Sequence, residues 1–394
     1  LKTDTESVDF YTKTDTEVLL ESISKWGIKK TLKKTRGMFA IALFDRMEKV
    51  LYLSRDRIGE KPLYYGKVGK RFAFASDLSS IEALEGFNNE ISLEALKLYF
   101  QHGYIPAPYS IYEGIYKLEA GTILAFKEKE LNYQIDYYWS IEEVAIKGQN
   151  NLFVGSEEDA AEELEKLLKE SIKMQMLADV PVGAFLSAGI DSTTVVALMQ
   201  NMTQIPVKTF TIGVKSAQYN EAVVAREIAE ILGTDHTELY ISEREAQAII
   251  PQLSNYYSEP FADSSQIPTM LVSKLARQKV TVSLSGDGGD ELFAGYKYYS
   301  FVNNVWEQVL QFPKPIRELG GWSARNIPIF NKSKLADKGK ILGCKSPEDL
   351  YNWDRTNKFD GRILRKDVMA YSKNDLCNKW IFDEYQQNIM LMDL

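Results

Sequence analysis

Two different patterns of hydrophobic and polar residues divide the chain. Between residues 36 and 75, short apolar runs alternate with turns, which predicts antiparallel strands. A helix over residues 14–27 is expected before them, because apolar residues recur at helical spacing and Gly27 supplies a stop. After these strands the pattern predicts a helix near residues 93–101, a loop rich in proline, and more short strands ending near Trp139.

The second pattern begins beyond the polar stretch 147–156, which is typical of a linker between domains. Helical and strand-like segments then alternate. The predicted helices cover residues 156–177, 192–200, 220–232 and 264–278, and the predicted strands cover residues 183–186, 207–214, 238–241 and 280–284. Strands separated by helices imply right-handed crossovers and a parallel sheet with helices on both faces. From residue 295 onward the chain reads as mainly helical, so we expect an antiparallel domain over residues 1–146 and an α/β domain over residues 156–394.

Composition and charge narrow the class of protein. With 394 residues, of which 45% are hydrophobic and 26% charged, the chain can bury the cores of two domains. Its apolar stretches are shorter than the roughly 18 to 20 residues of a membrane-spanning helix, and it does not start like a signal peptide. A net charge of −8 without a basic cluster argues against a nucleic-acid partner. Two distant cysteines give no disulfide framework or zinc ribbon, so we expect a cytoplasmic protein without membrane contacts.

The segment 185–192, with the sequence FLSAGIDS, is the first candidate for chemistry. A buried strand that ends in small and hydroxyl residues at a helix start presents backbone N–H groups and a positive dipole end, which suit a phosphate. The segment has no lysine next to Ser192, so it does not match a Walker P-loop, and it lacks the G-x-G-x-x-G spacing of a dinucleotide site. An ordinary strand-to-helix turn would leave the same pattern.

The segment 286–291, with the sequence GDGGDE, is the second candidate. Its three glycines allow a ligand to approach the backbone, while its three acids repel one another and call for a cation. Mg²⁺ shared with phosphates is the simplest choice because Mg²⁺ prefers hard oxygen ligands. A calcium loop or an acidic surface turn is the alternative, although the spacing of an EF-hand is absent. Since both segments follow strands of one expected parallel sheet, Asp191 and Asp290 would share one Mg-triphosphate at its carboxyl edge.

This combination resembles the pyrophosphate-loop ATP pyrophosphatases, and the whole chain resembles the glutamine-hydrolysing asparagine synthetase family. The resemblance rests on ordered motifs: TDTE at 14–17, RGMFA at 36–40, RDRIG at 55–59, KPLYY at 61–65, GYIP at 103–106, DVPVG at 179–183, and the segments 187–192 and 285–296. It implies a partial α+β antiparallel sandwich of the N-terminal-nucleophile type, a glutaminase, followed by an α/β parallel-sheet ATP pyrophosphatase domain. It further implies that ATP and Mg²⁺ activate aspartate as β-aspartyl-AMP, from which ammonia displaces AMP.

The resemblance also implies roles for single residues. Asp191 and Asp290 match the Mg²⁺ ligands. Asp287 stands where the family has a Glu or Asp proposed to take a proton from the attacking ammonia, and Asp15 matches the residue that holds the α-amino group of glutamine. The other matches to the ATP-binding positions are Leu186, Ser187, Gly189, Ser192, Ile212, Ser285 and Gly286.

Three departures from the family pattern modify these expectations. The sequence begins with Leu1 instead of a cysteine whose own α-amine acts as base, and a glutamine-binding asparagine–glycine–glutamate segment is missing, so we expect this polypeptide not to hydrolyse glutamine. It ends before later synthetase residues, including a lysine that contacts phosphates, which puts ammonia-dependent synthesis in doubt as well. Ala188 replaces a usual glycine, which would cost on the order of 1 kcal/mol if the position requires a positive φ.

The sequence is also compatible with other functions. A β-lactam-forming synthetase uses the same activation, although Asp15 in its TDTE context argues against it. The acceptor carboxylate is open too, because Glu259 and Asp263 are only weak candidates for an aspartate pocket. A related amidotransferase acting on another carboxylate, or a nucleotide-binding protein without turnover, would share the two segments. The family is often dimeric through its glutaminase domain, so a homodimer is possible.

Overall fold

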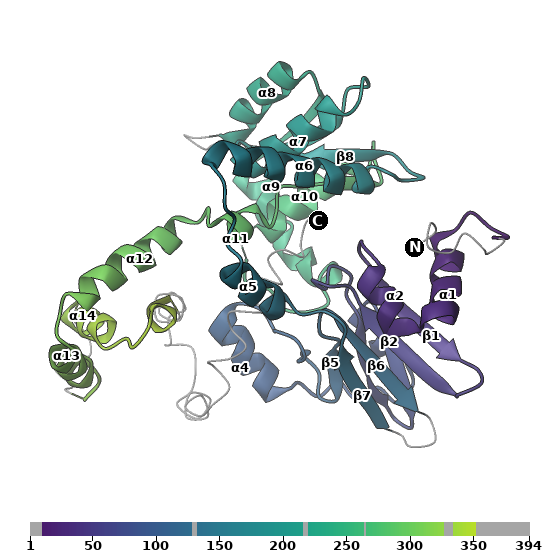
Figure 1. Cartoon of the computed structure of the whole chain (residues 1–394), viewed down its shortest axis with the longest axis horizontal. Helices are drawn as coiled ribbons and strands as arrows, with labels where there is room; N and C mark the ends of the chain where they lie inside the picture. Colours follow the sequence, from purple (N-terminus) through teal and green to yellow (C-terminus); the bar gives the residue numbers. More distant parts are fainter. Residues whose placement is uncertain (1–9, 128–131, 216–219, 264, 327–333, 352–394) are drawn as a thin grey trace.

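The structure is a computed structural model, and it describes residues 10–127, 132–215, 220–263, 265–326 and 334–351. Figure 1 shows two groups of elements, one above the other, and a helical arm that extends to the side. The N-terminal group holds antiparallel sheets, the next group holds a parallel sheet, and the arm holds the last of the described helices.

Two antiparallel sheets form the N-terminal group. One consists of β1 (Ala40–Asp45), β2 (Val50–Arg55), β6 (Thr122–Lys127) and β7 (Asn132–Tyr137), in the order β1-β2-β6-β7. The other consists of β3 (Tyr64–Val68), β4 (Arg71–Ala75) and β5 (Ile115–Lys117), in the order β4-β3-β5. Leu53 and Leu124 of the first sheet share one buried cluster with Tyr65 of the second. The predicted antiparallel strands are therefore confirmed, and the two sheets pack against each other.

Helices flank these sheets, namely α1 (Asp15–Trp26), α2 (Ile28–Lys34), α3 (Leu78–Glu82), α4 (Leu93–His102) and α5 (Ile141–Asn150). As the sequence predicts, α1 ends at Gly27, which has a φ of 79°. The expected linker 147–156 is wrong in its first four residues, because α5 continues to Asn150. Ser140 caps this helix by accepting a hydrogen bond from the Glu143 N–H, and acidic residues occupy its first turn, so local capping outweighs the polar composition.

A four-stranded parallel sheet organises the second group. Its strands are β8 (Val182–Phe185), β9 (Lys208–Val214), β10 (Asp235–Ile241) and β11 (Val282–Leu284), in the order β10-β9-β8-β11. The helices of this group are α6 (Glu157–Gln175), α7 (Ile190–Asn201), α8 (Glu221–Leu232), α9 (Glu243–Gln247), the 3-10 helix η3 (Ile250–Asn255) and α10 (Gln266–Ala276). Side chains of α6, α7 and α8 share one core with the sheet, and α10 packs on Phe210 in a separate core. The predicted parallel sheet with helices on both faces is confirmed.

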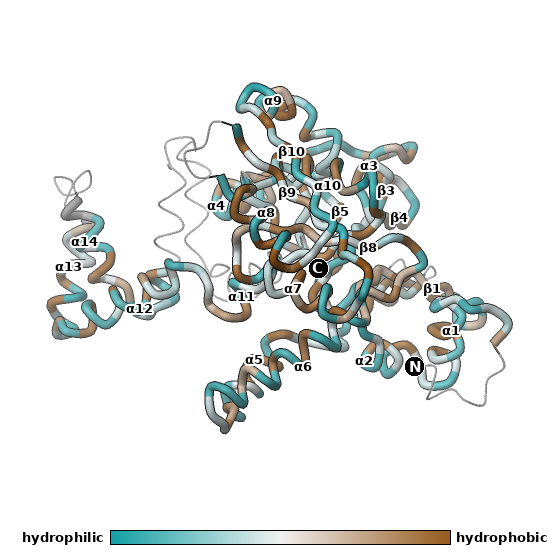
Figure 2. Tube along the Cα trace, turned by 90° about the horizontal axis from the view of Figure 1, so that it is seen from above, coloured by the Kyte–Doolittle hydropathy of each residue, from teal (hydrophilic) through white to brown (hydrophobic). Residues whose placement is uncertain are grey.

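The remaining described elements are α11 (Gly289–Phe293), α12 (Lys297–Leu310), α13 (Lys314–Asn326) and α14 (Lys334–Leu342). The expectation of a mainly helical C-terminal part is met as far as residue 351, and residues 352–394 lie outside the described part. Figure 2 shows apolar segments gathered around the strands, whereas α5, α6 and the arm alternate between polar and apolar residues. Among the described helices, none combines the length and apolar composition needed to cross a bilayer.

Candidate active site

The two candidate segments leave the same edge of the parallel sheet. Strands β8 and β11 are hydrogen-bonded neighbours, with Val282 opposite Val182 and Leu284 opposite Ala184. Because the strands are parallel, the loops that follow them emerge side by side. This is the edge at which open α/β sheets bind ligands.

The first loop is held by its own hydroxyl groups. The Oγ atoms of Ser187 and Ser192 lie 2.8 Å apart, and the Ser187 N–H donates to Ser192 Oγ over 3.2 Å. The Gly189 N–H donates to Ser187 Oγ over 3.1 Å. Gly189 is also the N-cap of α7 and brings no capping side chain, so the first turn of this helix faces the site through its backbone.

The second loop contacts the first so closely that an added Cβ atom would overlap it at two positions. A Cβ atom added to Gly286 would lie 2.3 Å from the backbone nitrogen of Ser192. A Cβ atom added to Gly289 would lie 2.4 Å from Cγ of Asp191, so the Asp191 carboxylate rests against the start of α11. Adjacent strand ends and these two glycines therefore bring the loops into direct contact.

Negative charge accumulates where the loops meet. Burial raises the pKa of the Asp191 carboxyl, and the nearby charge of Asp290 raises this pKa further. Burial also raises the pKa of Asp287 to about 6, and the charges of Glu291, Asp191 and Asp290 add to the rise. A hydrogen bond of 3.2 Å donated by Ser285 Oγ to the Asp287 carboxylate acts in the opposite direction.

These carboxylates suit a hard divalent cation. In the described part of the chain, no group of three or more histidine, cysteine or acidic side chains is arranged to hold a metal. Asp191 and Asp290, however, interact electrostatically and line the same cavity. Mg²⁺ commonly takes one or two protein carboxylates and completes its shell with water and phosphate oxygens, so this pair fits Mg²⁺ bound together with a phosphorylated ligand.

A cavity of about 410 Å³ opens between the two loops. It is lined by every ATP, Mg²⁺ and proton-transfer residue that the sequence proposed: Leu186, Ser187, Gly189, Asp191, Ser192, Ile212, Ser285, Gly286, Asp287 and Asp290. It is also lined by polar residues that sequence reasoning missed, namely Thr211, Glu221, Ser265, Thr269 and Tyr296. Tyr296 ends the motif segment 285–296 but was given no role, and the other missed residues are single polar side chains on elements that carry no motif. The position of Ser265 and Thr269 at the start of α10 was the available signal.

Ala188 does not carry the backbone strain considered for it. Within the described residues, Lys49 and Ala294 are the non-glycine residues with positive φ, and Ala188 is not among them. The conditional penalty of about 1 kcal/mol therefore does not arise, because the loop passes position 188 with an ordinary backbone conformation.

Asp15 lies apart from these residues, in the N-terminal group. It lines a cavity of about 950 Å³ formed between α1 and the start of β1. The same cavity is lined by Arg36, Met38, Phe39 and Lys61. The Asp15 cavity is thus separate from the cavity between the loops, with which it shares no lining residue.

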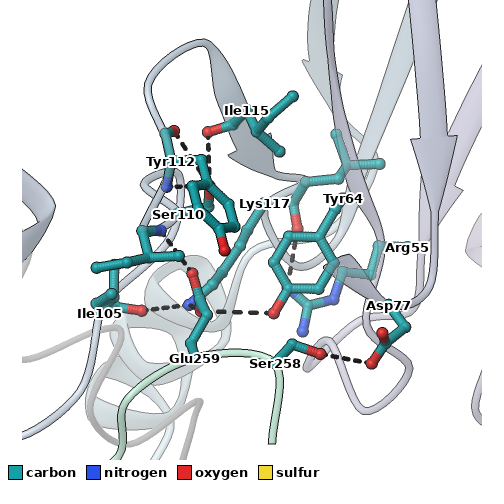
Figure 3. A network of polar contacts seen from close by, with 12 residues as sticks. Arg55, Tyr64, Asp77, Ile105, Ser110, Tyr112, Ile115, Lys117, Ser258 and Glu259 are labelled. Atoms are coloured by element: carbon teal, nitrogen blue, oxygen red, sulfur yellow. Dashed lines mark hydrogen bonds and ion pairs between the residues drawn. The ribbon is translucent and has the colours of Figure 1, made fainter. Parts of the chain in front are cut away.

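The suggestion that Glu259 lines a substrate pocket is wrong. Glu259 is not among the residues that line the cavity between the loops. Its carboxylate instead forms an ion pair of 2.5 Å with Lys117 in β5 (Figure 3). It also accepts a hydrogen bond of 2.8 Å from the Ile111 N–H. An acid before a helix looks the same in sequence whether it faces a pocket or another domain.

Two family models match the chain. A model described as a glutamine amidotransferase domain matches residues 1–139, and the asparagine synthase model matches residues 163–377. The second match alone covers more than half of the 394 residues. This chain belongs to the asparagine synthase family. The Asp15 cavity lies within the first matched region, and the cavity between the loops lies within the second.

Comparisons with individual proteins support the same family assignment. A relative from Methanocaldococcus jannaschii, assigned by name to the glutamine-hydrolyzing asparagine synthetases, is 41% identical over 350 residues, which cover 86% of this chain and 65% of the relative. Asparagine synthetase (glutamine-hydrolyzing) 1 of Bacillus subtilis is 32% identical over 370 residues, which cover 93% of this chain and 55% of that protein. The chain therefore spans between about half and two thirds of the length of these relatives. The solved structure of an NH3-dependent NAD synthetase from Campylobacter jejuni aligns with 50% of this chain and with 94% of the synthetase chain, at 14% sequence identity. Its TM-score of 0.29 is too low to define the fold.

Proposed function

We propose that this asparagine synthase family member amidates aspartate to asparagine with ATP and Mg²⁺, using ammonia derived from glutamine. The single observation that carries the proposal is the convergence of the two loops on one cavity, which all ten residues expected for ATP, Mg²⁺ and proton transfer line. The names of the relatives support the reaction, since those proteins are named as glutamine-hydrolyzing asparagine synthetases.

The proposal assigns a fold type to each group of elements. Residues 1–146 would be an N-terminal-nucleophile-type sandwich that binds glutamine at Asp15. Residues 156–394 would be a pyrophosphate-loop ATP pyrophosphatase domain. The antiparallel sheets and the parallel sheet support this division, as do the two matched regions.

The first chemical step would be an attack by the aspartate side-chain carboxylate on the α-phosphorus of ATP. The bond from this phosphorus to the bridging oxygen breaks, pyrophosphate leaves, and β-aspartyl-AMP forms. Asp191 and Asp290 would hold Mg²⁺, which neutralises phosphate charge when bound. The uncapped first turn of α7, with Ser187 and Ser192, would orient the departing pyrophosphate by hydrogen bonds.

The second step would be the displacement of AMP by ammonia. The nitrogen that attacks the acyl carbon becomes positively charged and must lose a proton. Asp287 is a candidate to accept this proton, because burial and neighbouring charges raise its pKa to about 6, so it is mostly ionised at neutral pH and still more basic than an ordinary carboxylate.

Exchange of labelled pyrophosphate into ATP tests the proposal. We expect exchange by the purified protein to require Mg²⁺ and to depend on aspartate. Exchange with a different carboxylate would redirect the proposal to a related amidotransferase or a β-lactam-forming enzyme. Binding of ATP without exchange, with any carboxylate, would point to a nucleotide-binding protein without turnover.

A further inference from the structure

One short segment joins the two groups of elements and is not accounted for by the proposed chemistry. This crossing segment, residues 257–263, lies between η3 and α10. Its Glu259 pairs with Lys117, and the side chain of Ser258 donates a hydrogen bond to Asp77 (Figure 3). Glu259 also accepts a hydrogen bond from the Ile111 N–H. The Ala262 N–H donates to the carbonyl oxygen of Gly103 over 2.7 Å. The crossing segment is thus attached to the N-terminal group by both side chains and backbone.

The ion pair in this attachment is shielded from water. The side chains of Glu259 and Lys117 are 10% and 18% exposed. Lys117 also donates a hydrogen bond to the carbonyl oxygen of Ile105, and the Tyr64 hydroxyl donates to Glu259 over 3.4 Å. A shielded pair whose members are also hydrogen-bonded holds one geometry, and removal of either member leaves an unpaired buried charge.

The other end of the crossing segment is bonded to the first turn of α10. The Gln266 side chain donates to the Phe261 carbonyl oxygen over 3.0 Å, and the Tyr257 hydroxyl donates to the Gln266 carbonyl oxygen over 3.1 Å. The Ser265 N–H donates to the Asp263 carboxylate over 2.8 Å. Four residues from this end of α10 and its cap line the cavity between the loops: Ser265, Pro268, Thr269 and Val272.

From these contacts we infer that Glu259 is a positioning residue, which fixes the α10 wall of the nucleotide cavity through its ion pair with Lys117 of the N-terminal group. Glu259 does not touch the cavity and acts only through the crossing segment and α10. The expected effect of Glu259 on nucleotide affinity rests on the proposed function. Its expected effect on how firmly α10 is held in place does not.

Two variants of Glu259 and one matched control test the inference. Glu259→Ala removes both the charge and the acceptor for the Ile111 N–H, whereas Glu259→Gln removes only the charge. The control Lys29→Met breaks the pair between Lys29 and Asp136, which has the same 2.5 Å length and lies in the same group, but is 46% and 66% exposed. An exposed pair of this kind contributes little to stability.

Hydrogen–deuterium exchange and calorimetry give the two readouts. In Glu259→Ala we expect amides of α10 to exchange about tenfold faster while those of α7 stay unchanged, because only the attachment of α10 is lost. The Kd for Mg-ATP should rise about tenfold, the size expected from the loss of one charge-assisted hydrogen bond. Glu259→Gln should give smaller changes of the same kind, and Lys29→Met should give neither.

The outcomes separate the inference from its alternatives. Unchanged exchange in α10 of both Glu259 variants would overturn it, as would faster exchange in α7 and α10 alike, which would indicate general destabilisation. If Glu259→Ala does not fold, Glu259→Gln decides on the same criteria. If the unmodified protein binds no nucleotide, the proposed function fails, and the exchange of α10 still decides the role of Glu259.

Discussion

A single methyl group at position 286 would separate the two loops on which the proposed activity depends. The Cβ atom of Gly286→Ala would lie 2.3 Å from the backbone nitrogen of Ser192 and 2.7 Å from the backbone carbon of Asp191. Ordinary van der Waals contacts begin at 3.4 Å. Because both neighbours are backbone atoms, no side-chain rotation can relieve the overlap, and one loop must move by about 1 Å.

The size of the effect follows from this displacement. Overpacking of a close contact typically costs about 1 to 3 kcal/mol of stability. A displacement of about 1 Å in a binding or catalytic group can cost on the order of 10²-fold in function. Since Gly286 is not among the glycines with positive φ, the effect of this substitution is steric rather than conformational.

Calorimetric titration with Mg-ATP and thermal unfolding measure the two consequences. We expect the Kd of Gly286→Ala to rise by about tenfold to 10²-fold, accompanied by a lower melting temperature. The matched control is Gly148→Ala in α5, where an added Cβ meets nothing within 4 Å. This control should bind normally and gain about 0.5 to 1 kcal/mol, the usual advantage of alanine inside a helix. A Kd of Gly286→Ala within twofold of the unmodified protein would refute the reasoning.

Three other substitutions probe the same cavity. Asp287 keeps its proton up to about pH 6 in the folded chain but only to about pH 4 when the chain is unfolded. In the absence of Mg²⁺, the free energy of unfolding should therefore fall by ~3 kcal/mol as the pH rises from about 4 to about 6. Urea unfolding at pH 4 and 7 should show this fall in the unmodified protein and not in Asp287→Asn; equal falls would contradict it. Asp191→Asn should weaken the binding of Mg-ATP, measured by calorimetry, by about tenfold or more. ATP without Mg²⁺ should bind as well or better, because the substitution removes a charge that repels the phosphates. An equal loss of affinity for both ligands would argue against a metal role. Ala188→Gly should leave the Kd for Mg-ATP equal or slightly improved, because Ala188 has no positive φ, and a large loss would conflict with the loop described here.

The cavity between the loops was predictable because its main parts are local in sequence. The segments 187–192 and 285–290 each follow a strand directly, so a correct assignment of β8 and β11 to one parallel sheet places both at one edge. Thr211 and Thr269 also line the cavity, but one lies in a strand and the other in a helix with no distinctive spacing. Their contribution depends on how β9 and α10 pack on the sheet, which hydrophobic patterning alone does not determine.

The wrong predictions arose where a distant contact or a cap decides the structure. The position of Glu259 before a helix suggests a pocket residue, whereas its partner Lys117 lies 142 positions earlier in the chain, in a strand of the other group. The polar composition of residues 147–156 predicts a linker, although Ser140 caps a helix that continues to Asn150. The partner of Glu259 is not visible from the residues next to it, whereas the cap at Ser140 lies seven positions before Lys147, outside the polar stretch itself.

A crystal structure with Mg²⁺ and a non-hydrolysable ATP analogue would show whether the two loops share one nucleotide. We expect one Mg²⁺ ion bound to carboxylate oxygens of Asp191 and Asp290 at about 2.1 Å, with the phosphates against residues 187–192. A nucleotide bound elsewhere, or a cation that contacts neither aspartate, would contradict it.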